Sequence, residues 1–201
     1  MKINFYTKIN KSTPSHLRGG VYALSGFTLV ELLIAMSILS IGILATFGAV
    51  SNNLRASNFA QDQVTAYYLA DEGIEYIHNL RDENGIKNVQ AIASGGSVPW
   101  LSGIAQVSGD PCFGGVACVA DSPLNTLTAC VGGSSGCPYL LIDPVSGLYG
   151  YTSTWTHTPF QRVITVNVVS STEAVVTVTV TWTTNSVSKS YSLSETLQSW
   201  E

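Results

Sequence analysis

The sequence predicts an α+β fold in which one long N-terminal helix packs against a C-terminal antiparallel β-sheet. Residues 27–50 are apolar on all sides, and residues 51–84 continue with apolar positions spaced three and four apart. This change is typical of a single helix that passes from apolar surroundings onto the face of a domain. Residues 151–201 contain segments in which apolar and polar residues alternate, which predicts strands. Residues 85–150 are rich in glycine, proline and serine, which predicts loops and turns.

Residues 1–26 form a polar, basic segment that is typical of a removable leader. This segment contains four basic residues and no acid: Lys2, Lys8, Lys11 and Arg18. The rest of the chain has five basic and 13 acidic residues, and therefore a formal net charge of −8. A basic stretch before an apolar run stays in the cytoplasm, which places the domain that follows outside it. The acidic remainder argues against direct binding of nucleic acid through a basic face.

Residues 27–50 have the length and composition of a single membrane-spanning helix. At 1.5 Å per residue these 24 positions would extend roughly 36 Å, enough to cross the hydrocarbon core of a bilayer. Secretory signals have a shorter apolar run followed by a cleavage site of small residues, and no such site follows here. We therefore expect the apolar segment to be retained. Its one charged residue, Glu31, would be costly in a bilayer core without a partner.

Residues 51–84 are predicted to form the amphipathic continuation of this helix. One stripe repeats at helical spacing: Phe59, Gln63, Ala66, Ala70, Ile74 and Ile77. Such a stripe predicts that this half of the helix packs against a domain. The stretch "RDENG" then predicts a helix end, with Gly85 as the residue that follows the last turn.

Four clustered cysteines, Cys112, Cys118, Cys130 and Cys137, predict two disulfides in an oxidising compartment. Their spacing does not match the close pairs of a zinc site, so no metal is expected. Folding the chain about Leu124 would place Cys118 opposite Cys130 and Cys112 near Cys137, and we favour this nested pairing. Local bridges, Cys112–Cys118 and Cys130–Cys137, are the alternative.

The sequence also predicts the strands of the sheet. Short strands are expected around residues 117–120, 126–130 and 139–142. Three longer strands follow with short connections, which indicates an antiparallel meander. The middle one alternates without error and presents Val176, Val178, Val180 and Trp182 on one face. The strand before it presents Phe160, Ile164, Val166 and Val168, and the strand after it Val187, Tyr191 and Leu193.

No set of residues predicts an enzyme. His78 and His157 lie far apart in the sequence, and no G-x-S-x-G sequence is present. Asp110, Asp121 and Asp143 lie in turn-rich stretches, where aspartate ordinarily caps its own backbone. Loop carboxylates of this kind also suit calcium, but these are too scattered for us to predict a site. We expect no catalytic residue, no metal and no cofactor.

The stretch G-F-T-L-V-E, residues 26–31, opens the apolar run and resembles the class III signal of type IV prepilins and pseudopilins. This resemblance implies that Gly26 is the last residue of the leader and that a prepilin peptidase cuts between Gly26 and Phe27. It further implies that the new amino group of Phe27 is methylated and that Glu31 serves in filament assembly. The Phe27 ammonium of one subunit could meet Glu31 of its neighbour, which would remove an unpaired buried charge.

The following stretch, "AQDQVTAYYLADEGIEYIHNLRDENG", is similar to minor pilins and to I-type or V-type pseudopilins. The resemblance implies a structural protein, not an enzyme, in a type IV pilus, a type II secretion pseudopilus or a DNA-uptake system. The implied partners are the peptidase, other pilins, an assembly platform protein with its ATPase, and membrane lipid. The implied location is the cytoplasmic membrane, with the N-terminus cytoplasmic, and afterwards a surface or periplasmic filament. A membrane-tethered binding or adhesin domain that does not polymerise, with residues 112–137 contacting a ligand, is the alternative.

Overall fold

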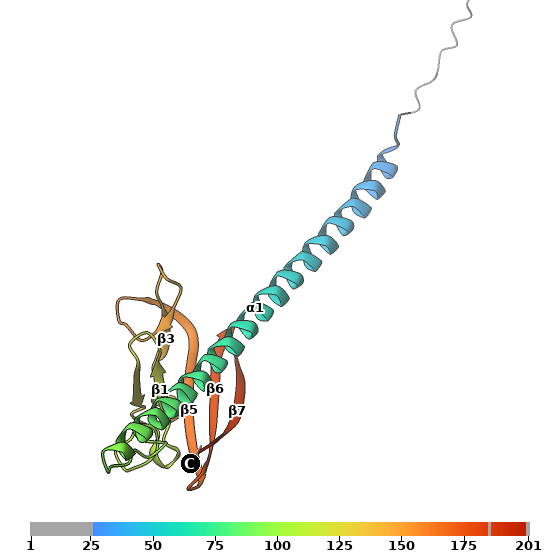
Figure 1. The fold of residues 1–201 in the computed structure, drawn as a ribbon. Helices are drawn as coiled ribbons and strands as arrows, with labels where there is room; N and C mark the ends of the chain where they lie inside the picture. The colour runs from blue at the N-terminus through green and yellow to red at the C-terminus, as the bar shows by residue number, and fades with distance from the viewer. Residues whose placement is uncertain (1–25, 185, 200–201) are drawn as a thin grey trace, which may run out of the picture. The chain divides into compact units, whose positions relative to one another are not determined.

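The computed structural model describes residues 26–184 and 186–199, and it divides into two compact units, Met1–Val50 and Ser51–Glu201. The predicted leader therefore lies outside the described residues, except for Gly26. One helix, α1, spans Leu29–Ala93 and belongs to both units (Figure 1). The strands are β1 (Cys118–Asp121), β2 (Thr126–Ala129), β3 (Tyr139–Ile142), β4 (Tyr149–Gly150), β5 (Thr156–Ser170), β6 (Glu173–Thr184) and β7 (Val187–Gln198). One-turn 3₁₀ helices occur at Phe113–Gly115 and Ser134–Gly136. The predicted α+β fold is confirmed.

The described part of the first unit consists of the helical residues up to Val50 and the three residues before them. Every described side chain in it is exposed. Among the described residues, α1 is the one helix that is long and apolar enough to cross a membrane, judged by length and composition.

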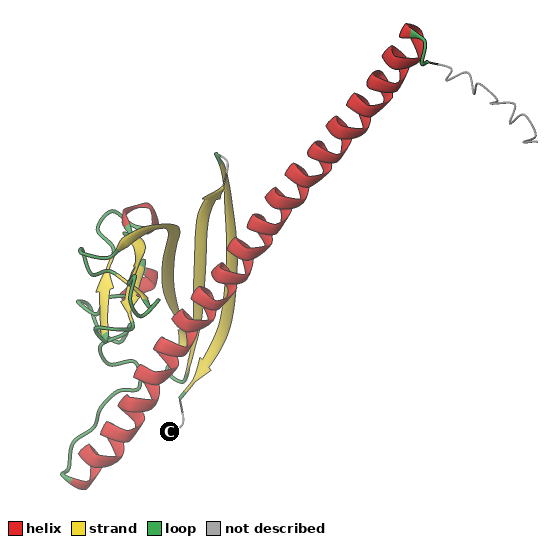
Figure 2. Cartoon of the chain, turned by 90° about the horizontal axis from the view of Figure 1, so that it is seen from above, coloured by secondary structure: helices red, strands yellow, loops and turns green. Residues whose placement is uncertain are grey.

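In the second unit, α1 lies across one face of the sheet (Figure 2). Close approach is possible because Gly73 has no side chain at the contact. A Cβ at that position would lie 3.0 Å from Cγ1 of Val178 and 3.3 Å from Cδ of Arg162. A glycine within a helix costs about 1 kcal/mol of stability relative to alanine. At position 73 this glycine allows the helix to pack closely on β6.

The predicted helix end at Gly85 is wrong, since α1 continues to Ala93. Two side-chain interactions support the helix on both sides of the glycine. Lys87 pairs with Glu83 one turn earlier at 2.9 Å, and the buried amide of Asn84 donates to the carbonyl of Ser102 at 2.8 Å. The helix ends instead at Ala93, and Gly95, two residues later, adopts a left-handed conformation (φ +81°) suited to a residue without a Cβ.

The sheet is antiparallel and centres on β5, which pairs with β6 along one edge and with β1 and β3 along the other. β7 pairs with β6 over twelve consecutive residue pairs, so β5, β6 and β7 form the predicted meander. The three predicted short strands are also present, as β1, β2 and β3, with ends shifted by at most one residue.

The core lies between α1 and the sheet. The face predicted for β6 is confirmed, since Val176, Val178, Val180 and Trp182 are all buried. The faces predicted for β5 and β7 hold in part: Val168 and Val187 are about half exposed, at 51% and 52%. The β5 face contains an unpredicted member, Arg162, which is completely buried.

The cysteines form the local bridges, Cys112–Cys118 and Cys130–Cys137, with Cα–Cα distances of 5.4 Å and 4.8 Å. The predicted nested pairing is wrong because of strand register. Cys118 lies opposite Ala129, so Cys130 is one position out of register with it. Side chains one position apart point to opposite faces of a sheet. Cys118 accordingly packs in the core under α1, whereas Cys130 packs in a second cluster with Ala117.

Candidate processing and assembly site

The start of α1 is defined by a cap that the sequence analysis overlooked. Thr28 precedes the helix, and its Oγ1 accepts a hydrogen bond from the backbone N–H of Glu31 at 3.2 Å. Its carbonyl accepts the first helical hydrogen bond, from Leu32 at 3.1 Å. Thr28 and Glu31 have the T-x-x-E spacing of a capping box, and this pattern could have been found from the sequence.

Because the helix begins at Leu29, the peptide bond between Gly26 and Phe27 lies outside it. Both residues are exposed, and no atom lies within 4 Å of the position that a Cβ on Gly26 would occupy. Exposed backbone outside regular structure is the usual site of proteolytic cleavage. The structure therefore leaves this bond open to a peptidase.

Glu31 lies in the first turn of α1. A negative charge at this end of a helix is favourable because the unpaired N–H groups of the first turn form the positive end of the helix dipole. Its side chain is exposed, and it makes no ion pair with any residue in the described part of the chain. The carboxylate is therefore available to a partner from outside this segment.

The other polar side chains between residues 29 and 50 are satisfied by the helix itself. The hydroxyl of Ser37 donates to the carbonyl of Leu33 at 2.8 Å, and that of Ser40 donates to Met36 at 2.7 Å. Thr46 donates in the same way to Ile43 at 2.8 Å. Such bonds allow serine and threonine to lie in apolar surroundings, where an unsatisfied polar group is costly. Glu31 thus differs from these residues, because its side chain has no partner within the helix.

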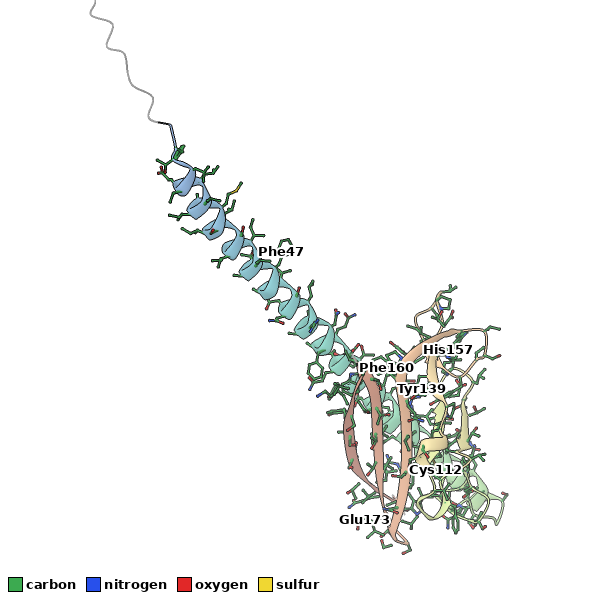
Figure 3. All side chains as sticks on the ribbon, turned by 180° about the vertical axis from the view of Figure 1, so that it is seen from behind. Phe47, Cys112, Tyr139, His157, Phe160 and Glu173 are labelled. Atoms are coloured by element: carbon green, nitrogen blue, oxygen red, sulfur yellow. A yellow bond between two sulfur atoms is a disulfide. The ribbon has the colours of Figure 1, made fainter. Side chains whose placement is uncertain are left out.

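Large apolar side chains surround this part of α1 on all sides (Figure 3). They include Phe27, Leu29, Leu33, Met36, Ile38, Leu39, Ile41, Leu44, Phe47 and Val50, all more than half exposed. Exposed apolar surfaces of this size are rare on monomeric soluble proteins and mark contact with a membrane or with other protein chains. The segment is therefore built to be covered by lipid or by apolar helices.

In the second unit, the most unusual charged group is the buried Arg162 on β5. Its Nη1 lies 3.1 Å from Oε2 of Glu72 and donates to the carbonyl of Leu69 at 3.1 Å. Its Nη2 donates to the carbonyl of Ala120 at 2.7 Å. Ser122 donates to the other carboxylate oxygen of Glu72 at 2.5 Å. One guanidinium therefore connects α1 with β5 and β1, which is a structural role.

Tyr151 lies close to this cation. Burial raises the pKa of its phenol to about 12, although the positive charge of Arg162 acts in the opposite direction. The backbone N–H of Tyr151 donates to Asp121, which also accepts from Leu124 in its own turn. These contacts hold the segment before β5 against β1, and they suggest no reaction.

Two of the remaining candidate side chains, Asp143 and Asp110, accept hydrogen bonds within their own turns. Asp143 accepts hydrogen bonds from the hydroxyl of Ser146 and from the backbone N–H of Val145, which lower the pKa of its carboxyl group. Asp110 accepts from two backbone N–H groups of its own turn. His157 lies on β5 and is labelled in Figure 3. In the described part of the chain, no three histidine, cysteine or acidic residues gather as metal ligands would.

The first unit is therefore an exposed apolar helix with a capped start, an open peptide bond before it and one acid in its first turn. These features suit a helix that anchors a protein in a membrane. Residues 25–47 match the family model described as the prokaryotic N-terminal methylation motif. The chain thus carries the N-terminal signal characteristic of type IV prepilins and pseudopilins, as the sequence predicts. Comparisons with curated proteins and with solved structures gave no significant match.

Proposed function

We propose that the chain is a minor pilin or pseudopilin subunit of a type IV pilus or a type II secretion pseudopilus. The observation that carries the proposal is the methylation motif at residues 25–47, within a helical segment, residues 29–50, in which Glu31 is the one polar side chain without a partner in the described chain. In this role the protein is structural. Its partners are a prepilin peptidase, other pilins, and the platform protein and ATPase that add subunits to the filament.

Processing creates a positively charged group that can pair with Glu31. Cleavage between Gly26 and Phe27 frees an α-amino group, which has a pKa of about 8 and is mostly protonated at neutral pH. Methylation of this nitrogen keeps its positive charge. In the filament, the Phe27 ammonium of one subunit pairs with Glu31 of the next, and neither charge is then left alone among apolar helices. Residues 27–50 form the filament core, and the second unit covers it.

The precursor is held in the cytoplasmic membrane before assembly. Its basic leader stays on the cytoplasmic side, where the peptidase cuts, and the domain with its two disulfides lies outside. Assembly then carries the subunit from lipid into a bundle of similar helices. The apolar side chains of residues 27–50 suit both surroundings, so the electrostatic pair, not apolar burial, determines the register between subunits.

Processing is tested by mass spectrometry of the protein from cells with and without a prepilin peptidase. We expect a chain that begins with N-methylated Phe27 when the peptidase is present, and a precursor that retains its leader when the peptidase is absent. An intact precursor in cells with an active peptidase would contradict the proposed processing.

Assembly is tested with Glu31→Gln, which removes the charge and keeps the size of the side chain. We expect normal insertion and processing but much less protein in sheared filaments. Glu195→Gln is the matched control, because Glu195 is an exposed acid within the second unit. Equal recovery of the Glu31 variant and the parent protein would exclude the proposed pairing. A processed parent protein that never enters filaments would favour the tethered binding domain.

A further inference from the structure

The second unit contains an acidic pocket that the proposed function does not use. It has a volume of about 290 Å³ and lies between one side of α1 and the turn from β1 to β2, which contributes Ser122 and Asn125. Three carboxylates of α1 line the pocket, those of Glu72, Glu75 and Glu83. All three side chains are at least partly exposed, so the acidic pocket presents negative charge to the solvent.

The three carboxylates differ in how they are paired. Glu72 lies 3.1 Å from the buried Arg162, and Glu83 pairs with Lys87 at 2.9 Å on the helix surface. Glu75 makes no ion pair with any residue of the described chain. The acidic pocket therefore contains one carboxylate whose charge is not compensated within the unit.

Tyr76 gives independent evidence that the acidic pocket lacks a ligand. Its side chain lines the pocket although the residue is only 7% exposed. In the described chain its hydroxyl has no hydrogen-bond partner, and it is not among the enclosed polar atoms without one, so it opens into the pocket. Burial, with the negative charges of Asp121 and Glu83, raises the pKa of this phenol. A neutral phenol without a partner can accept a hydrogen bond from a bound cation.

The arrangement suits an organic cation better than a metal ion. Across the described residues, no three acidic, histidine or cysteine side chains lie close enough together to hold a metal. A guanidinium group is larger and carries five N–H donors in one plane, so it can reach a carboxylate and a phenol at the same time. The acidic pocket therefore fits an arginine side chain.

The second unit has one basic side chain without a partner, that of Arg55. The other four basic residues of the unit each pair with an acid or lie over an aromatic ring: Arg81, Lys87, Arg162 and Lys189. Arg55 is exposed and makes no such contact within the described chain. It precedes Glu75 by 20 residues on α1, which is roughly 30 Å along the helix. Arg55 therefore cannot reach the acidic pocket of its own chain.

We propose that the acidic pocket binds the guanidinium group of Arg55 from a second copy of the chain. The inference rests on the proposed function, because the contact joins neighbouring subunits of a filament. Arg55 donates to the carboxylate of Glu75 and to the hydroxyl of Tyr76, which gives each of these unpaired groups a partner.

The position of the two surfaces on α1 determines the kind of interface. Two copies with parallel helices make this contact when one is displaced by roughly 30 Å along the helix axis. Different surfaces of the two copies meet, so the interface is head-to-tail and can repeat along a filament. Two precursors anchored at the same depth in one bilayer do not have this displacement. The contact therefore forms during assembly and not before it.

The test is charge reversal in the full chain, produced in cells with a working assembly system. Arg55→Glu and Glu75→Arg each bring like charges together, and each should lower the amount of protein in sheared filaments about tenfold. Both changes in one chain exchange the two charges and should restore recovery. Lys189→Glu is the matched control, because it makes the same change of charge at an exposed lysine on β7. This control should neither lower recovery nor rescue Glu75→Arg.

A second measurement locates the contact directly. A photoreactive benzoylphenylalanine at position 58 replaces an exposed serine one turn after Arg55. Irradiation of filaments should link position 58 of one copy to a peptide from residues 72–83 of another. Irradiation of membranes from cells without the assembly ATPase should not give this product.

The outcomes separate this inference from the proposed function. A parent protein that never enters filaments contradicts the proposed function and this inference with it. If the parent assembles, equal recovery of Arg55→Glu and Lys189→Glu overturns the inference alone. Loss of recovery that the double variant does not restore also overturns it, because Arg55 and Glu75 then act at separate places. Restored recovery together with the predicted cross-link supports the contact.

Discussion

The two parts of α1 differ in where their stabilising contacts come from. Between residues 29 and 50 every side chain is exposed, and the polar groups either bond to their own helix or, at Glu31, have no partner in the described chain. In the second unit the same helix buries nine residues: Ala66, Leu69, Ala70, Gly73, Ile74, Tyr76, Ile77, Arg81 and Asn84. The first part therefore depends on other molecules for burial, whereas the second depends on this chain's own sheet.

Because of this difference, we expect mutations in the two parts of α1 to have separable effects. Changes in the packed part should lower the free energy of unfolding of the second unit. Changes in the exposed part should leave that free energy unchanged and act on insertion, processing or assembly. The following predictions test this separation, from the largest expected effect to the smallest.

Arg162→Met should have the largest effect. The substitution keeps an unbranched side chain but removes the cation from Glu72 and two hydrogen bonds from buried carbonyls. Breaking a buried ion pair by removing one partner costs about 3–5 kcal/mol. We expect a loss of this size in the free energy of unfolding, measured by urea titration of the full chain in nanodiscs.

Two further variants control for this result. Arg55→Met changes an exposed arginine of α1 and should stay within about 0.5 kcal/mol of the parent. Glu72→Gln should cost less than Arg162→Met, because the Glu72 side chain is 36% exposed while that of Arg162 is buried. Equal stability of Arg162→Met and the parent would show that this cation does not hold the helix on the sheet.

The burial of Arg162 could not be predicted from the sequence. Alternation on β6 predicts its buried face correctly because every residue on that face is apolar. On β5 the same alternation places position 162 on the buried face, but a charged residue is ordinarily expected to face solvent. Only the three-dimensional structure shows that Glu72, ninety residues earlier, and the carbonyls of Leu69 and Ala120 meet it there.

The candidate site was more predictable than the packing. The G-F-T-L-V-E stretch is local, so its residues and order could be read directly, and the cap at Thr28 follows from the same six residues. Disulfide pairing depends instead on strand register, which spacing alone does not determine, and the nested pairing was wrong for that reason. The helix end was missed because the contacts of Asn84 with the loop at residues 100–102 continue the helix through Gly85.

High pH should destabilise the second unit through Tyr151. Its pKa is raised from about 10 to about 12 in the folded protein, because burial disfavours the phenolate. The folded state then binds the phenol proton more tightly than the unfolded state. The resulting stabilisation is fully present below pH 10 and is lost as the pH rises from 10 to 12.

Tyr151→Phe removes the group that titrates. Between pH 10 and pH 12 the variant should therefore lose about 2 kcal/mol less unfolding free energy than the parent. The measurement is the free energy of unfolding from urea titrations across this range. Tyr151 belongs to the second unit, so a difference between the variant and the parent reports on that unit. Parallel pH profiles for the variant and the parent would contradict the role assigned to burial of this phenol.

A matched pair of glycine substitutions compares the two parts of α1 directly. Gly73→Ala places a Cβ 3.0 Å from Cγ1 of Val178, whereas Gly42→Ala meets nothing within 4 Å. Overpacking costs about 1–3 kcal/mol, partly offset by a gain of about 1 kcal/mol in helix propensity. We expect Gly73→Ala to lower the thermal midpoint of the second unit and Gly42→Ala to leave it unchanged. A shift of the same size in both variants would mean that the two parts unfold together.

Thr28→Val should have the smallest and most local effect. The substitution keeps the branched shape of the side chain and removes the oxygen that accepts from the N–H of Glu31. Loss of a helix cap costs about 1 kcal/mol, which corresponds to roughly fivefold faster hydrogen exchange at that amide if opening of the first turn controls it. Thr46→Val is the control, because the Thr46 hydroxyl donates to Ile43 within the helix and caps nothing. Neither variant should change the unfolding of the second unit. Unchanged exchange at Glu31 in Thr28→Val would show that the start of α1 is set by its surroundings in the membrane and not by the capping box.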